Sequence, residues 1–98
     1  MRVGYARQGY IYFKSLIYKD LSPEERSRIM SLCKKAGGEH HRALFEFVTT
    51  QDTATSICAR HFIASPTTLH MLARKYYEMF SAVMEEEKRG EDSSLRSE

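Results

Sequence analysis

Apolar side chains recur every three or four residues along most of this chain, and that spacing predicts helices. The first clear helix begins after Ser22, which can cap its start, with Pro23 at the first helical position. Gly37 and Gly38 end this helix. A second helix is predicted over residues 39–50, where apolar side chains again recur at core spacing.

Two further helices are predicted on either side of a short connection. The third covers about residues 53–62, and the fourth begins at Ser65 and Pro66, again a capping residue followed by a proline. The fourth helix can continue without a break until Gly90 stops it. Its second half has an apolar stripe, made of Tyr76, Met79, Phe80 and Val83. The stripe either packs on residues 10–33, which is the default, or pairs with a second copy.

Residues 1–19 form a segment rich in tyrosine and phenylalanine, interrupted by basic residues, which we call the aromatic arm. Apolar side chains at helical spacing predict a short helix over residues 10–18. The part before it contains Gly4 and Gly9 and is expected to be flexible or extended. The aromatic side chains either pack against the helical body or form a dimer contact.

These elements predict an all-α fold, a small helical bundle with a helix-turn-helix corner and a long carboxy-terminal helix. A length of 98 residues fits one domain, and a hydrophobic content of 42% is enough for a core. We expect an arm or short helix over residues 1–19 and a helical domain over residues 20–89, with the corner at residues 55–74. Residues 90–98 are expected to be a disordered acidic tail.

The formal net charge is +2, but the charge is unevenly distributed. Residues 1–84 contain 12 basic and 7 acidic side chains, whereas residues 85–98 contain 3 basic and 6 acidic ones. The body of the protein is therefore modestly basic, which is compatible with a polyanionic partner but does not identify one.

Residues 55–74 are the segment on which the functional prediction depends. With Thr55 as the first position of a helix-turn-helix, small and apolar residues fall at the inward positions, and Ser65 caps the second helix. The residues expected to face inward are Cys58, Ala59, Phe62, Ala64, Leu69 and Leu72.

The strings ICARHF at residues 57–62 and IASPTTL at residues 63–69 resemble the helix-turn-helix superfamily. The likeness is to resolvase, transposase and AraC-type DNA-binding segments, and it covers about residues 39–75. The turn in this superfamily usually begins with a glycine, because the backbone there has a positive φ. This chain has Ile63 at that position, and a positive φ is costly for a β-branched residue. The turn therefore either has another geometry or lies at a shifted position.

The resemblance implies that the second helix lies in the major groove of double-stranded DNA. Its outward side chains would be Ser65, Pro66, Thr67, His70, Met71 and Arg74. Arg74 could bind guanine or phosphate, and Lys75, Arg60 and Arg42 would attract the DNA backbone. So few cations give a single copy only weak affinity, so tight binding requires a homodimer, formed through the aromatic arm or the long carboxy-terminal helix.

The resulting hypothesis is a small DNA-binding protein, acting as a transcriptional regulator or as an accessory factor of a mobile element. The alternative is a helical protein–protein interaction module that binds no nucleic acid, since short helical corners also occur as purely structural features.

The sequence contains no nucleophile motif and no glycine-rich phosphate loop, so we expect neither an enzyme nor a cofactor. The residues Cys33, His40, His41, Cys58 and His61 lack the spacing of a zinc site, and no metal is expected. The chain has neither a membrane-spanning run nor a secretory signal, and its two cysteines suit a reducing compartment. A cytoplasmic location is therefore predicted.

Overall fold

The computed structural model describes the backbone of residues 4–96 and the side chains of residues 4–87. Every regular element in this part of the chain is helical, which confirms the predicted all-α fold. The α-helices are α1 (Tyr5–Leu16), α2 (Pro23–Gly37), α3 (His41–Thr49), α4 (Ala54–Arg60) and α5 (Pro66–Arg96). Single 3₁₀ turns at Tyr18–Asp20 and Gly38–His40 follow α1 and α2. None of the described helices has the length and hydropathy that a membrane span requires.

The aromatic arm differs from its prediction, because α1 begins at Tyr5 and includes Gly9. A glycine inside a helix costs about 1 kcal/mol, which packing of the neighbouring residues can offset. Here Ile11 and Ser15 are fully buried against the body of the protein. The flexible or extended arm expected before residue 10 is therefore helical from Tyr5 onward.

Local signals place α2 where the sequence predicted it. The backbone N–H of Glu25 donates to Ser22 Oγ over 3.3 Å, and Pro23 is the first helical residue. Gly38 ends the helix with a φ of 56°, a conformation that glycine adopts without a steric penalty. The capping and terminating residues were both identified correctly.

Side chains also cap the last two helices, Thr53 at the start of α4 and the predicted Ser65 at the start of α5. Thr53 Oγ1 accepts a hydrogen bond from the N–H of Ser56 at the start of α4. In α5 the helix continues past Gly90 to Arg96, so the predicted stop and the predicted disorder of residues 91–96 are wrong. One glycine lowers helix stability by about 1 kcal/mol, which does not by itself end a long helix. Residues 97 and 98 lie outside the described part.

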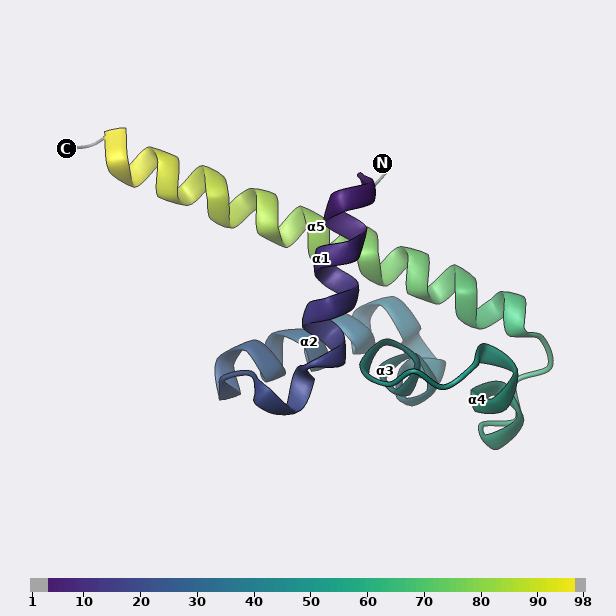
Figure 1. The fold of residues 1–98 in the computed structure, drawn as a ribbon. Helices are drawn as coiled ribbons and strands as arrows, with labels where there is room; N and C mark the ends of the chain where they lie inside the picture. The colour runs from purple at the N-terminus through teal and green to yellow at the C-terminus, as the bar shows by residue number, and fades with distance from the viewer. Residues whose placement is uncertain (1–3, 97–98) are drawn as a thin grey trace.

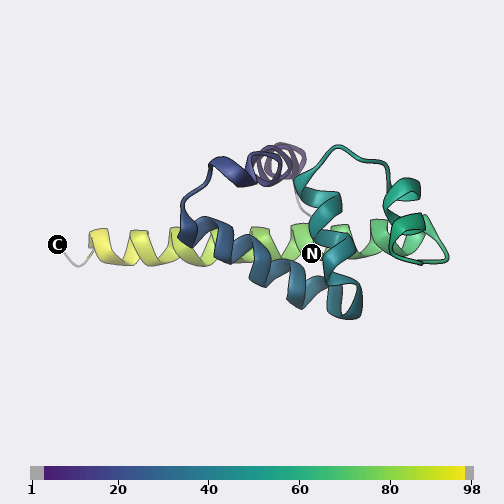
Figure 2. The same ribbon diagram turned by 90° about the horizontal axis from the view of Figure 1, so that it is seen from below.

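The long helix α5 forms the axis of the molecule (Figures 1 and 2). Helices α2, α3 and α4 pack along it, and α1 lies across it. Within the predicted apolar stripe, Tyr76 and Phe80 are buried, and Tyr76 Oη lies 2.8 Å from Ser15 Oγ of α1. The stripe therefore packs within the chain, which confirms the default interpretation.

Candidate nucleic-acid interface

The connection between α4 and α5 is a tight corner with one left-handed residue. That residue is Phe62, whose φ is 58°, and it comes one position before the predicted Ile63. The next N–H, of Ile63, donates back to the carbonyl oxygen of Cys58 over 2.9 Å. This bond spans the end of α4 in the manner of a Schellman motif, in which the residue with positive φ is usually glycine. The turn is therefore shifted by one residue from the predicted register.

Because of this shift, some of the side chains that face inward differ from those predicted. Phe62, Ala59 and Ala64 are exposed, so their predicted inward positions are wrong. The left-handed residue turns its own side chain outward, and the following residue, Ile63, is buried in its place. Inward packing of Cys58 and Leu69 is confirmed. Leu72 is partly buried against the core, as expected.

The beginning of α5 is held by hydrogen bonds to the corner. Ser65 Oγ accepts from the N–H of Thr67 over 3.2 Å, and the thiol of Cys58 donates to the Ser65 carbonyl over 3.7 Å. The cap leaves the first turn of α5 at a defined position relative to α4. Both Ser65 and Pro66 are partly buried in this arrangement.

One side of the first turns of α5 is open to solvent. Thr67, His70, Met71 and Arg74 have the spacing of one helix face, and all four are exposed together with the adjacent Lys75. On the opposite side, Leu69 and Tyr76 are fully buried. The predicted outward residues beyond the cap therefore lie together on one accessible surface, which we call the α5 face.

Neighbouring elements border the α5 face without covering it. The ring of Phe47 on α3 contacts His70 edge-on, with 5.5 Å between ring centroids. Helix α1 meets α5 beyond Arg74, where Arg7 donates to Ser81 Oγ over 3.0 Å and to Glu85 over 2.9 Å. Helix α1 thus leaves the α5 face, which ends at Lys75, accessible.

Not all the predicted cations are available to a polyanion. Arg60 forms ion pairs with Glu46 and Asp52, and His61 Nε2 lies 2.7 Å from the other oxygen of Glu46. The hydrogen bonds from His61 and Arg60 hold the pKa of Glu46 below its usual value. Arg60 therefore joins α4 to α3 and is not a free cation, contrary to its predicted role.

Three other predicted cations remain. Arg42, Arg74 and Lys75 are exposed, and none of them forms an ion pair with another of the described side chains. Only Arg74 and Lys75 belong to the α5 face, while Arg42 lies near the start of α3. The positive charge of the surface is therefore small.

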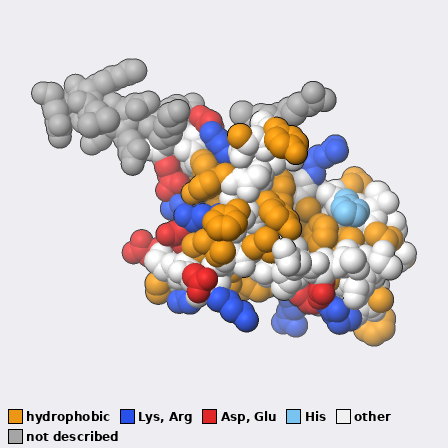
Figure 3. Space-filling view, viewed as in Figure 1, with side chains coloured by type: hydrophobic (Ala, Val, Ile, Leu, Met, Phe, Trp, Pro, Cys, Tyr) orange, Lys and Arg blue, Asp and Glu red, His pale blue; other side chains and the backbone are white. Residues whose placement is uncertain are grey.

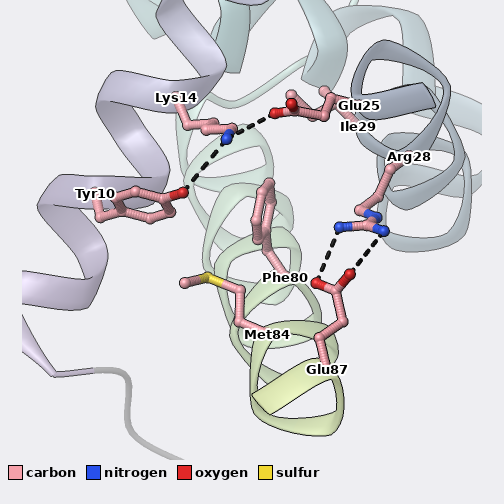
Figure 4. A pocket seen from close by; sticks show the side chains of 8 residues that line it. All are labelled: Tyr10, Lys14, Glu25, Arg28, Ile29, Phe80, Met84 and Glu87. Carbon is pink, nitrogen blue, oxygen red and sulfur yellow. Dashed lines mark hydrogen bonds and ion pairs between the residues drawn. The ribbon is translucent and has the colours of Figure 1, made fainter. Parts of the chain in front are cut away.

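A pocket of about 390 Å³ lies between α1, α2 and α5 (Figure 4). The charged groups that line it form two ion pairs. Lys14 lies 2.6 Å from Glu25, and Arg28 contacts both carboxylate oxygens of Glu87, at 2.8 and 3.0 Å. The rest of the lining is aromatic or aliphatic: Tyr10, Ile29, Phe80 and Met84. The pocket thus offers apolar surface and no unpaired charge to a ligand.

The cysteines and histidines do not assemble into a metal site within the described residues. Cys33 and Cys58 are both buried and unpaired. Burial raises the pKa of the Cys33 thiol to about 12, which keeps it protonated. The two cysteines therefore act as small core side chains.

Phe62 and the outer side of α1 are exposed features that sequence reasoning did not place. The exposure of Phe62 depends on the register of the turn, which the helical spacing did not reveal. For α1, the pattern left open whether the aromatic rings pack against the helical body or form a dimer contact. A comparison with known protein families, curated proteins and solved structures finds no match to this chain.

Proposed function

We propose that this is a cytoplasmic DNA-binding protein of the helix-turn-helix type, whose α5 face enters the major groove. The observation that supports this most directly is the exposure of Thr67, His70, Met71 and Arg74 on one side of a capped helix. An α-helix fits the width of the major groove, and a recognition helix reads base edges with its first turns. A transcriptional regulator or a mobile-element accessory factor would use such a surface.

Each side chain of the α5 face suits a contact. The guanidinium of Arg74 can donate two hydrogen bonds to a guanine, and the thioether of Met71 can contact a thymine methyl group. Thr67 near the helix start is suited to a phosphate oxygen, where the helix dipole also favours negative charge. Lys75 adds attraction to the backbone.

The small positive charge sets the expected strength of binding. Two cations on the α5 face displace few counterions, so one copy should bind weakly and lose affinity as the salt concentration rises. Low-salt measurements are therefore the informative ones.

A fluorescence anisotropy titration with a labelled mixed-sequence duplex, at about 50 and 200 mM salt, tests the proposal. The double variant Arg74→Ala, Lys75→Ala should weaken binding about tenfold or more at the lower salt concentration. The matched control is Lys34→Ala, Lys35→Ala, which removes the same charge from exposed positions of α2. Absence of binding at low salt, or equal losses for both pairs, would rule out a specific role for the α5 face.

A second candidate function is contact with another protein without any binding to nucleic acid. The exposed aromatic rings of α1 favour it, since large aromatic side chains are enriched at protein interfaces. The titration separates the two candidates, because this alternative predicts no change in anisotropy at either salt concentration.

A further inference from the structure

Helix α1 has two sides with opposite properties. Its inner side is fixed to the body: Ile11 and Ser15 are buried, and Arg7 and Lys14 form ion pairs with Glu85 and Glu25. Its outer side is open to solvent, and apolar side chains gather over it in Figure 3. The helix is therefore held in place by contacts that leave the aromatic rings of its outer side exposed in the described part of the chain.

The outer side is strongly aromatic. Tyr5 is 95% exposed, Phe13 62%, and Tyr10 and Tyr12 47% each. An aromatic side chain has about 200 Å² of surface, so these fractions leave roughly 500 Å² of aromatic surface in water. A patch of that size is at the upper end of what monomeric proteins expose, and such patches usually mark interaction sites.

The described part of α1 offers a polyanion no unpaired cation. The exposed positions of α1 are uncharged throughout: Tyr5, Ala6, Gln8, Gly9, Tyr10, Tyr12 and Phe13. The two described cations of the helix are already paired with carboxylates. A second copy of the same surface would meet it without charge repulsion.

Gly9 allows this surface to pack closely against the same surface of a second copy. Tyr5, Gly9 and Tyr12 follow one another at helical spacing, so Gly9 lies between the two tyrosines on the same face. A Cβ added at Gly9 would meet nothing within 4 Å. Gly9 therefore leaves open backbone on this face, which we call the Gly9 notch, and a ring from an identical helix can pack against it.

The areas agree with this pairing. Full coverage of the aromatic surfaces of two copies would bury at most about 1,000 Å² in total, which reaches the lower limit for a specific interface. The pocket beside Tyr10 extends the surface, because Ile29, Phe80 and Met84 line it and its charges are paired.

We propose that a second copy of this chain docks on the outer side of α1, so that the two α1 helices pack on each other about a two-fold axis. In a two-fold interface the same patch serves both copies, and each Gly9 notch receives a ring of the other copy. The inference depends on α1 alone and is independent of DNA binding by the α5 face.

Sedimentation equilibrium of the full chain tests the proposal with the variant Gly9→Arg. The substituted side chain has room in the monomer, and replacing a helical glycine favours the helix, so the fold is retained. The wild type should sediment as a dimer, and Gly9→Arg should lower the association constant about a hundredfold by filling the notch with a charge. Circular dichroism checks that helicity is unchanged.

Ser31→Arg is the matched control, since it adds the same charge at an exposed position of α2. It should sediment as the wild type does. A wild type that stays monomeric at high concentration, a mass above that of a dimer, or an unaffected Gly9→Arg dimer would overturn the proposal. Loss of DNA binding alone, with the dimer intact, would count against the α5 face and not against this interface.

Discussion

Phe62 has an unfavourable backbone conformation, and its exposed side chain contributes no burial energy that would offset this cost. Its φ is 58° and its ring is 95% exposed. The left-handed conformation costs a non-glycine residue about 1–2 kcal/mol, whereas glycine adopts it freely. We therefore expect Phe62→Gly to raise the free energy of unfolding by about 1 kcal/mol, as measured by urea denaturation.

The neighbouring exposed residue provides the control for this effect. Ala64 has no positive φ, so Ala64→Gly only adds conformational freedom to the unfolded chain and should not stabilise the protein. If Phe62→Gly were neutral or destabilising, the ring of Phe62 would have a stabilising contact in solution, and the Schellman ending of α4 would need revision.

At the scale of whole elements, Glu46 joins α3 to α4 by accepting hydrogen bonds from Arg60 and His61. Those bonds lower the pKa of Glu46, so the stabilisation is present above the pKa of an unfolded glutamate and is lost as the pH falls through the lower folded value. Glu46→Gln should therefore cost up to about 1 kcal/mol at pH 7, and this cost should shrink below about pH 4.

Urea denaturation at several pH values measures the pH dependence of this contact. Glu86→Gln is a suitable reference, because it removes an exposed carboxylate that has no ion pair among the described side chains. A cost for Glu46→Gln that is the same at pH 7 and at about pH 3 would show that the carboxylate is not ion-paired in solution.

Elements with local signals could be predicted from the sequence, and those that depend on distant contacts could not. The start and end of α2 follow from Ser22, Pro23 and Gly38, which act within one turn. Helix α1 contains Gly9 and forms over its full length with Ser15 against Tyr76, a partner 61 residues away. The spacing of apolar residues does not reveal such a contact. The prediction that Gly90 ends α5 was also wrong, because the helix continues to Arg96.

The corner shows the same limit within the candidate site. The helical pattern predicted two helices joined by residues 63–65 and the exposed side chains Thr67, His70 and Arg74, whereas the connection in the structure covers residues 61–65. It misplaced the left-handed residue by one position, because the hydrogen bond from Ile63 to Cys58 selects the register. The ion pairs of Arg60 with Glu46 and Asp52 could not be predicted from the helical pattern either, because they depend on how α3 meets α4.

At the scale of the whole molecule, the α1 and α5 faces are expected to act together. Among the described residues, the unpaired cations of each α5 face are Arg74 and Lys75. A dimer that presents two such faces therefore doubles the number of phosphates contacted. Gly9→Arg should therefore weaken DNA binding about tenfold or more and roughly halve the slope of log affinity against log salt. Anisotropy titrations across a salt series measure both quantities.

The added charge makes this test stringent. An arginine at residue 9 would by itself strengthen attraction to phosphate, so a fall in affinity must come from loss of the second copy. Ser31→Arg adds the same charge without touching α1 and should bind DNA at least as well as the wild type. If Gly9→Arg became monomeric yet kept the affinity and salt slope of the wild type, each copy would bind DNA independently, and pairing through α1 would serve another purpose.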